Sequence, residues 1–339
     1  MNGSDTPSSL ERLGWSEFFA AQVEPGEAHL APRRIASVHR ARLEAIDAGG
    51  PAELELSANA NTADFAVGDW VLADPMTDML LRRLDRKTVL QRHSEIRNGL
   101  QLAAANVDTL FITTSCNADF NPARLERYLI MAHQAGTRPV ILLTKADTAA
   151  DAEDYRRQAE ALQRDLPVVV LNARSPDAVE ILKPWCGAGQ TVALVGSSGV
   201  GKSTLVNTLA GLEGGGQKTG TIREYDAQGR HTTTARSLHA IAGGGWVIDT
   251  PGIRTLYVSD VTDGIDILFG DIADLAAQCR FRDCTHAHEP GCAVQAAVKS
   301  GLLDTDRLGR WRVLIEESRS RTPVKTGPRG NKIIRRGKY

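Results

Sequence analysis

The feature that most constrains the fold is one octapeptide, Gly196-Ser197-Ser198-Gly199-Val200-Gly201-Lys202-Ser203. It directly follows the apolar run Thr191–Val195 and precedes a helix-forming run, which is the strand–loop–helix context that a P-loop requires. Glycines let backbone N–H groups turn toward phosphates, and Lys202 would reach the β- and γ-phosphates. Ser203, followed by Thr204, would coordinate Mg²⁺ at the start of the helix. The chain is therefore expected to bind a nucleoside triphosphate on an α/β sheet.

Strands and helices alternate around this loop. Asn121-Pro122 predicts the start of a helix that continues to about Gln134 and ends at Gly136, because an asparagine cap and a first-turn proline favour helix initiation. A second helix is expected from Lys202, and a third covers residues 152–164. Apolar runs predict strands at residues 107–113, 139–143, 167–171, 192–195 and 246–248. This alternation predicts a parallel sheet with helices on both faces.

Recognition of the base is predicted by Thr144-Lys145-Ala146-Asp147, which follows one of these strands. The Asp147 carboxylate could accept hydrogen bonds from N1–H and the 2-amino group of guanine, which adenine does not present in that arrangement. The Lys145 stem would lie along the ring. Asn172-Ala173 follows the next strand, where a second base-contacting loop is expected. These motifs favour guanine nucleotides.

Downstream of the P-loop, Asp249-Thr250-Pro251-Gly252 follows the strand at 246–248. Asp249 could hold Mg²⁺ through a water molecule, and the Gly252 amide could sense the γ-phosphate. Between the two motifs, residues 214–235 form a long polar stretch that contains His231-Thr232-Thr233-Thr234. Loops of this length are usually functional. Thr233 or Thr234 is the expected threonine ligand of Mg²⁺.

The water-orienting residue must come from elsewhere, because Ile253 occupies the position after Gly252 where many GTPases carry glutamine. His231 is the candidate, since a neutral imidazole can orient a water molecule or accept its proton near pH 7. His231 and Lys202 are thus the predicted catalytic residues for cleavage of the β–γ phosphoanhydride bond of GTP. Two alternatives remain open, a P-loop ATPase or kinase and an RNA-binding module that uses nucleotide only as a regulatory ligand.

The region before the sheet has a different pattern. Short alternating runs at residues 35–41, 53–57, 69–73 and 79–84 are separated by turn residues, which predicts a small antiparallel barrel or sandwich. Such barrels often bind oligonucleotides, although one that only supports its neighbours would look the same. An amphipathic piece, Leu10–Gln22, lies before it in a Pro- and Gly-punctuated arm.

Three of the five cysteines crowd together near the C-terminus in the pattern Cys279-x₄-Cys284-x-His286-x₅-Cys292. Three thiolates and one imidazole form a soft tetrahedral set suited to structural Zn²⁺, with no open position for catalysis. His288 competes with His286 as the nitrogen ligand. Short helices are expected around the cluster at residues 271–278, 293–300 and 306–318. Cys116 and Cys186 stand apart in apolar surroundings and are expected to be ordinary buried side chains.

Charge and hydropathy add two expectations. No run of 18 apolar residues occurs, and the polar start of the chain does not resemble a signal peptide, so a cytoplasmic protein without membrane association is expected. The 40 basic and 41 acidic residues nearly cancel, but residues 319–339 carry eight Lys or Arg and no acid. This basic tail is suited to phosphate contacts with RNA.

The motifs run in the order base recognition, P-loop, Asp-x-x-Gly, so the usual order of a GTPase domain is circularly permuted. With Gly68-Asp69-Trp70-Val71, Ala105-Asn106-Val107-Asp108 and the cysteine cluster, the chain resembles the circularly permuted RsgA family of ribosome biogenesis GTPases. Thr144 and Asn172 depart from the commonest residues of such motifs. The resemblance supports His231 as catalytic and His286 as the zinc ligand.

The resemblance implies a multidomain α/β protein and a monomer that binds GTP, GDP, the 30S subunit and 16S rRNA late in 30S maturation. Hydrolysis is expected to be slow alone and stimulated by 30S subunits. The implied division is an N-terminal arm (1–33), an OB-fold β-barrel of RNA-binding type (34–98), a circularly permuted GTPase domain (99–260), a helical zinc-binding domain (261–318) and a basic tail (319–339).

Overall fold

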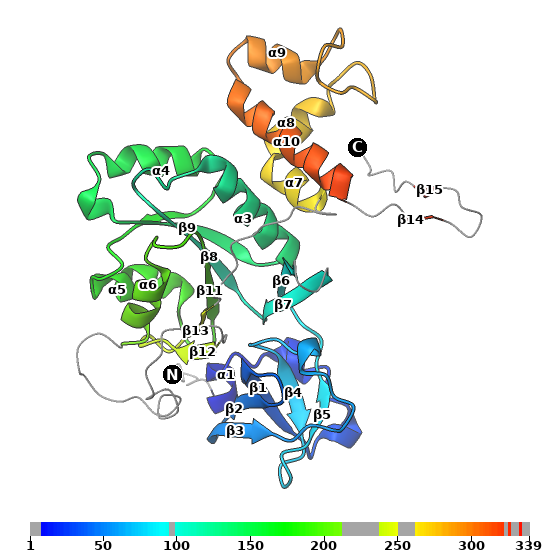
Figure 1. Ribbon diagram of the computed structural model, residues 1–339, viewed down its shortest axis with the longest axis vertical. Coiled ribbons are helices and arrows are strands. Elements are labelled where there is room, and N and C mark those ends of the chain that lie inside the picture. Colours follow the sequence, from blue (N-terminus) through cyan, green and yellow to red (C-terminus); the bar gives the residue numbers. More distant parts are fainter. Residues whose placement is uncertain are drawn as a thin grey trace, which may run out of the picture.

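The computed structural model describes residues 8–94, 99–211, 237–249 and 262–321, together with two short strands, β14 (Lys325–Thr326) and β15 (Lys332–Ile333). Figure 1 shows three regions, a small β-structure at the bottom, an α/β layer structure in the middle and a group of helices at the top. None of the helices in these ranges combines the length and apolar character needed to cross a bilayer.

The lower region is a closed five-stranded barrel. Strand β1 (Ala31–Val38) pairs antiparallel with β2 (Leu43–Asp47) and β4 (Trp70–Ala73), β2 pairs with β3 (Gly50–Leu54), and β4 pairs with β5 (Leu80–Arg83). A parallel bridge between Glu55 and Met79 joins the end of β3 to the start of β5 and closes the ring. This circuit is the OB-fold order expected from the family resemblance. Strand β2 was not among the four predicted strands, because Leu43–Asp47 is short and mixes polar and apolar residues.

The N-terminal segment packs on the outside of this barrel. The expected amphipathic piece consists of two short helices, α1 (Ser9–Arg12) and α2 (Glu17–Ala20), because Gly14 at φ 92° interrupts it. Trp15 stacks edge-on against the buried Trp70 of β4 with ring centroids 4.9 Å apart, and Phe19 lies 5.8 Å from the same ring. The 3₁₀ turns η1 (Pro25–Glu27) and η2 (Thr62–Asp64) complete this region.

The central sheet has the predicted α/β character. The strand order is β10-β9-β8-β11-β13-β12, with the first five parallel and β12 antiparallel to β13. The bounds are β8 Thr109–Ser115, β9 Arg138–Thr144, β10 Val168–Val170, β11 Thr191–Val195, β12 Ser237–Ala240 and β13 Trp246–Asp249. Strand β12 was not predicted, because its residues Ser-Leu-His-Ala have no strong strand preference. Its place between β13 and the barrel strand β1 makes it a strand.

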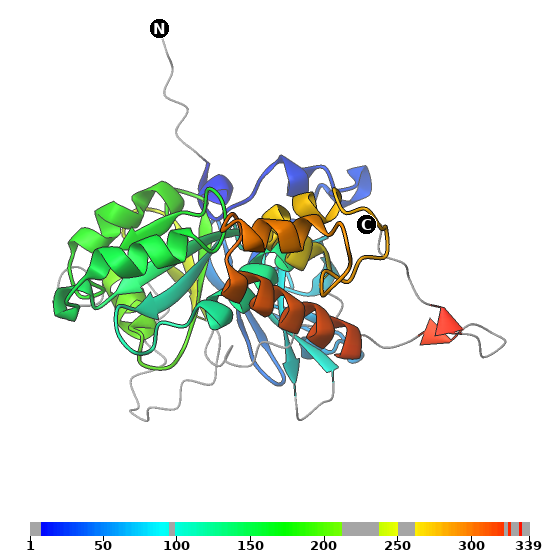
Figure 2. The ribbon, with the colours of Figure 1, turned by 90° about the horizontal axis from the view of Figure 1, so that it is seen from above.

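Helices cover both faces of this sheet, as predicted (Figure 2). Side chains on a strand alternate between faces, so Leu110 and Ile112 pack with α3 (Pro122–Ala135) and α4 (Ala152–Glu160). Phe111 packs instead with α5 (Asp177–Leu182) and α6 (Lys202–Leu209). Helix α5 was not predicted, and α4 is shorter than expected. The 3₁₀ turns η3 (Ala146–Thr148) and η4 (Lys183–Trp185) connect these elements.

Helix α3 begins and ends as its sequence predicts. The Asn121 side chain accepts a hydrogen bond from the Arg124 amide, Pro122 occupies the first turn, and Gly136 adopts a left-handed conformation at φ 74° after the last residue. These caps satisfy backbone groups that the helix itself leaves unpaired.

Two connections join the barrel region to the central sheet. Strand β1 pairs with β12 at Ser37 and Ser237, so one continuous sheet runs from the barrel into the α/β region. A separate hairpin of β6 (Val89–Ser94) and β7 (Gly99–Ala105) lies between them in the chain. This hairpin spans the expected domain boundary at 98/99, and β1 starts before residue 34. The domain division remains a proposal.

The upper region consists of four helices, α7 (Thr262–Leu268), α8 (Gly270–Ala276), α9 (Ala293–Lys299) and α10 (Thr305–Arg321), within residues 262–321. The three predicted helices correspond to α8, α9 and α10, whereas α7 was not predicted. Helix α7 packs against α3 of the central region (Figure 1), and α10 contacts α3 through ion pairs. The C-terminal helices therefore pack on the face of the sheet that α3 covers.

Candidate nucleotide and metal sites

The P-loop connects β11 to α6 as its sequence predicts. Gly196, Gly199 and Gly201 have φ values of 141°, 80° and 98°, in the region that L side chains rarely adopt. A Cβ at Gly196 would lie 2.1 Å from the Thr113 carbonyl oxygen of the neighbouring strand. Glycine at position 196 is therefore required by both the backbone angle and the close approach of β8.

Lys202 begins α6 and folds back over the loop. Its Nζ donates hydrogen bonds to the carbonyl oxygens of Gly196 at 2.9 Å and Ser197 at 2.5 Å. The buried Val200 and Leu205 anchor the loop and the helix in the core. Ser203 and Thr204 follow Lys202 in the first turn of α6, and Ser198 lies between two of the loop glycines. A helix start with a lysine and several exposed amides can bind a polyphosphate.

Two loops from earlier in the chain meet the P-loop. The fully buried Thr144 at the end of β9 has its Oγ1 2.6 Å from the Val200 carbonyl oxygen, within hydrogen-bonding distance. Thr208 of α6 donates a hydrogen bond to the Ala173 carbonyl at 2.7 Å, and a Cβ on Gly201 would lie 3.6 Å from that of Ala173. The segments after β9 and β10 are therefore held directly against the P-loop.

The predicted base-contacting residues have different exposures. Asp147 is exposed in the η3 turn, and Lys145 adopts a left-handed conformation at φ 56° just before it. Asn172 is exposed as well, with its side-chain oxygen accepting a hydrogen bond from the Arg174 amide at 3.0 Å. Thr144, by contrast, turns its side chain into the core and toward the P-loop backbone. The threonine at this position thus joins two loops of the site.

Asp249 lies at the carboxyl end of β13, on the same end of the sheet as the P-loop. Burial raises the pKa of this carboxyl group, while the nearby charges of His239 and Lys202 act in the opposite direction. Such a partly buried carboxylate close to the P-loop lysine suits a metal-assisted phosphate site. His231, Thr233, Thr234 and Gly252 lie outside the described residues.

Sequence reasoning missed one residue at this site, Arg124. It lies in the first turn of α3, and its guanidinium donates a hydrogen bond to the Ser197 hydroxyl of the P-loop. A cation in the first turn of a helix opposes the helix dipole. The sequence did show this unfavourable positive charge in the first turn of a predicted helix, and it could have marked Arg124 as a candidate site residue.

The cysteine–histidine cluster is assembled as predicted. One ligand atom from each of Cys279, Cys284, His286 and Cys292 lies within 4.8 Å of the others. The His286 Nδ1 is 3.5 Å from the sulfur atoms of Cys279 and Cys292, and those sulfur atoms are 3.9 Å apart. Tetrahedral Zn²⁺ bonds of standard length would separate nitrogen and sulfur ligands by about 3.6 Å and two sulfurs by about 3.8 Å. The four residues therefore fit a tetrahedral ion.

Hydrogen bonds hold the loop of this cluster in place. The His286 carbonyl accepts a hydrogen bond from the Gln295 side chain at 2.6 Å and another from Arg312. The Glu289 carboxylate accepts hydrogen bonds from the Thr285 hydroxyl and amide, the latter at 2.8 Å, and from the Ala287 and His288 amides at 3.1 Å. These bonds strongly lower the pKa of Glu289, the Thr285 hydroxyl most of all. His288 is exposed and lies outside the cluster.

The two isolated cysteines are core residues. Cys116 and Cys186 are 3% and 2% exposed, and burial raises the pKa of the Cys186 thiol to about 12. Burial also raises the pKa of Cys116. Neither thiol is activated as a nucleophile, which agrees with the prediction.

Fold and site together define a P-loop nucleoside triphosphatase whose base-side loops precede the P-loop in the chain. The profile of the RsgA GTPase family matches residues 83–259. A protein described as small ribosomal subunit biogenesis GTPase RsgA from Mesorhizobium japonicum is 67% identical over 325 residues, covering 96% of this chain and 94% of that protein. Small ribosomal subunit biogenesis GTPase RsgA 2 from Vibrio vulnificus is 45% identical over 93% of this chain and 89% of its own.

Solved structures agree with these relatives. YjeQ from Thermotoga maritima aligns with a TM-score of 0.62 at 25% identity, covering 85% of this chain and 98% of that structure. YloQ, described as a circularly permuted GTPase, has the same TM-score and the same fold at 24% identity, covering 88% of this chain and 99% of its own. The chain belongs to the RsgA GTPase family and is an enzyme that hydrolyses GTP. The alternative of an ATPase or kinase is thereby excluded.

Proposed function

We propose that this GTPase binds the small ribosomal subunit and hydrolyses GTP during late assembly of that subunit. The names of the relatives support the biological setting. The structural observation that carries the biochemical part is the meeting of three loops at one end of the sheet, where Thr144 and Ala173 contact the P-loop. A base-reading loop and a phosphate-binding loop in direct contact can bind one nucleotide between them.

Each residue of this site has a proposed role. The amides of Gly196–Gly201, with Lys202, hold the phosphates, and the exposed Asp147 accepts hydrogen bonds from guanine while Lys145 lies along its ring. Asn172 and Ala173 form the second loop beside the base. Thr144 supports the site through its contact with Val200.

For hydrolysis, we propose that a water oxygen attacks the γ-phosphorus as the bond to the β–γ bridging oxygen breaks, leaving GDP and phosphate. His231 orients that water, and the Gly252 amide contacts the γ-phosphate. A bound Mg²⁺ would supply charge neutralisation between the β- and γ-phosphates. Ser203 and Thr233 or Thr234 would hold it directly, and Asp249 would hold it through a water molecule.

We propose that the tetrahedral cluster of Cys279, Cys284, His286 and Cys292 holds one structural Zn²⁺. Its donor set and its ligand spacing support this assignment. Metal analysis of the purified protein should find about one zinc per chain, and the Cys292→Ser variant should contain little. A full complement of zinc in that variant would contradict the assignment.

Contacts with 16S rRNA are proposed for the OB-type barrel and for the basic tail at 319–339. The barrel has the closed five-strand circuit used by many oligonucleotide-binding domains. The tail carries eight basic residues and no acid, which favours phosphate contacts that weaken with salt. We propose that the protein acts as a monomer in the cytoplasm.

GTP turnover with and without purified 30S subunits tests the proposal. Without a glutamine to orient the attacking water, intrinsic hydrolysis is expected to be slow, so 30S subunits should accelerate it by about tenfold or more. Lys202→Ala is the negative control and should be inactive in both conditions. Equal wild-type rates with and without 30S subunits would contradict the ribosomal role. A Lys202→Ala protein that still supports 30S assembly in cells would favour a nucleotide-independent RNA-binding role.

A further inference from the structure

Helix α3 contacts both the P-loop and the C-terminal helices through neighbouring residues. Arg124 donates a hydrogen bond to Ser197 of the P-loop. Two residues later, Glu126 accepts hydrogen bonds from Arg310 of α10 at 2.8 and 3.0 Å. Residues two apart on an α-helix point to nearly opposite sides, so α3 is held between the P-loop and α10.

The first contact is unusual for a helix start. Arg124 lies where the helix dipole disfavours a cation, and the ion pairs found within the described ranges include no carboxylate for it. Ser197 is held from two sides, since Lys202 Nζ donates to its carbonyl oxygen and Arg124 to its hydroxyl. A change in the position of Arg124 would therefore shift Ser197 and, with it, the part of the P-loop that binds the Lys202 side chain.

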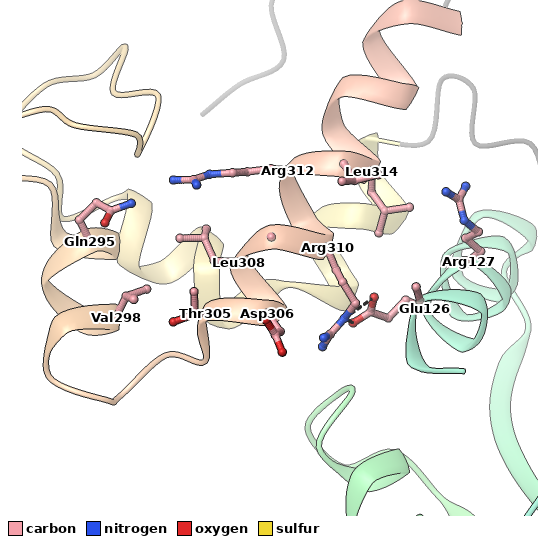
Figure 3. A pocket seen from close by; sticks show the side chains of 13 residues that line it. Glu126, Arg127, Gln295, Val298, Thr305, Asp306, Leu308, Arg310, Arg312 and Leu314 are labelled. Carbon is pink, nitrogen blue, oxygen red and sulfur yellow. Dashed lines mark hydrogen bonds and ion pairs between the residues drawn. The ribbon is translucent and has the colours of Figure 1, made fainter. Parts of the chain in front are cut away.

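The second contact is a buried ion pair. The Glu126 side chain is wholly buried, and its carboxylate faces the Arg310 guanidinium (Figure 3). A second arginine of α10, Arg307, has its Nη1 4.0 Å from Glu126 Oε1. A cavity of about 730 Å³ opens beside the pair, lined by residues of α3, α9 and α10. These charged contacts therefore link α10 directly to α3 beside the cavity.

A third contact belongs to the same interface between α3 and α10, which we call the α3–α10 seam. Arg127 of α3 pairs with Glu317 of α10 at 2.5 Å, and Arg307 additionally donates to the Leu162 carbonyl at 2.8 Å and to Asp271 of α8 at 2.8 and 2.9 Å. The C-terminal helices therefore dock on the GTPase region through the packing of α7 against α3, and α10 adds these charged contacts with α3.

We propose that docking of α10 on Glu126 positions the first turn of α3, so that Arg124 acts as a positioning residue for the P-loop and couples the C-terminal helices to the nucleotide site. The proposal rests on the proposed role of the P-loop in holding the nucleotide phosphates. It assigns the coupling to packed contacts of α3. A ribosomal contact that moves α10 would change the nucleotide site by this route.

Equilibrium binding of fluorescent GDP and steady-state GTP hydrolysis test the proposal on the full-length protein. Arg124→Gln should weaken GDP binding about fivefold, the loss expected from one hydrogen bond, and should raise KM and lower kcat together. The paired replacement Glu126→Gln with Arg310→Met removes both charges, so neither is left buried alone. This paired variant of the α3–α10 seam should weaken GDP binding to a similar degree, although neither Glu126 nor Arg310 forms a hydrogen bond or ion pair with the P-loop among the described contacts.

Combining the variants decides between coupling and general damage. If both act through Arg124, the triple variant should bind GDP no more weakly than Arg124→Gln alone, whereas independent effects would add. Arg156→Gln on the exposed face of α4 and Glu316→Gln on the exposed side of α10 are the matched controls. Zinc content and melting temperature of each variant verify folding.

Two results would overturn the proposal. One is a folded, zinc-containing seam variant that binds GDP within about twofold of the wild type. The other is full additivity in the triple variant. Failure of the proposed function looks different, because the wild-type protein itself would then not bind GDP or would not respond to 30S subunits.

Discussion

The barrel and the C-terminal helices flank the same central sheet but are attached to it in different ways. The barrel joins through backbone pairing of β1 with β12 and through the buried Arg34, which donates hydrogen bonds to Thr191 Oγ1 at 2.7 Å and to the Leu13 carbonyl at 2.6 Å. The C-terminal helices join through the packing of α7 against α3 and through charged side chains on α3 and α10.

The two attachments also differ in their distance from the nucleotide site along the sheet. Arg34 reaches the amino end of β11, whereas the P-loop follows its carboxyl end. Helix α3, in contrast, contacts the P-loop through its own first turn. The barrel is thus joined by a strand pairing and a buried arginine, whereas the helices are joined by packing on α3 and by charged side chains on the helix that contacts the P-loop. The C-terminal helices are the better placed to respond to nucleotide.

Removal of the proposed zinc ion should have the largest effect, and only on the side of the C-terminal helices. Structural zinc contributes about 10–16 kcal/mol of apparent binding free energy in small zinc domains, and α8 and α9 are short helices beside the cluster. Chelation should therefore unfold residues 262–321 while the barrel and central sheet stay folded. Limited proteolysis with mass spectrometry should then show new cleavage confined to that range. An unchanged cleavage pattern in verified metal-free protein would contradict this expectation.

Replacing Arg34 should have the next largest effect, on the barrel side. Burial lowers the pKa of Arg34 to about 10, and the charge of Asp108 opposes this shift. Arg34→Met keeps the apolar stem but leaves two buried acceptors unpaired, at a cost of about 2–4 kcal/mol. Thermal unfolding should occur at a temperature several degrees lower, with GTP turnover of the folded protein nearly unchanged. The exposed Arg40→Met is the control, and equal melting temperatures for the two variants would refute the role of Arg34.

Asp249→Asn tests the nucleotide end of the sheet. Because burial raises the folded-state pKa of Asp249, its stabilising contribution is complete below its unfolded pKa and is lost as pH rises through the folded pKa. The asparagine variant should melt about 2 °C above the wild type at pH 7, and this gain should vanish at acidic pH. GTP hydrolysis should fall at the same time. Asp274→Asn, at an exposed position, is the control. If the gain in melting temperature did not depend on pH, ionisation of the Asp249 carboxyl group could not be its cause.

Ser37→Ala should have the smallest effect on GTP turnover, and it tests whether the barrel attachment influences the nucleotide site. The Ser37 side chain lies 3.1 Å from His39 Nε2, while its backbone forms the pairing with Ser237. Loss of the hydroxyl leaves that backbone pairing in place, so GTP turnover should stay within about twofold of the wild type. A fivefold change in this variant would show that the barrel seam also couples to the nucleotide site.

Features with local causes were predictable from the sequence. Asn121, Pro122 and Gly136 set the ends of α3 through caps formed within a few residues. The cysteine–histidine cluster was predictable because Cys279, Cys284, His286 and Cys292 lie within fourteen residues of one another. Strand β12 was missed because its own residues have no strong strand preference, and one of its two partners, β1, is distant in sequence.

By itself, the sequence determined the order of the nucleotide motifs, the P-loop glycines and the metal-ligand spacing, since each depends on backbone angles or ligands close together in the chain. Only the tertiary structure decided that Arg124 meets Ser197, that Glu126 meets Arg310 and that Arg34 reaches Thr191. These contacts join residues 73, 184 and 157 positions apart. Whether a charged side chain is exposed or buried against such a partner depends on which elements pack together. A local pattern, such as the unfavourable charge of Arg124 at a helix start, can mark a residue but does not identify its partner.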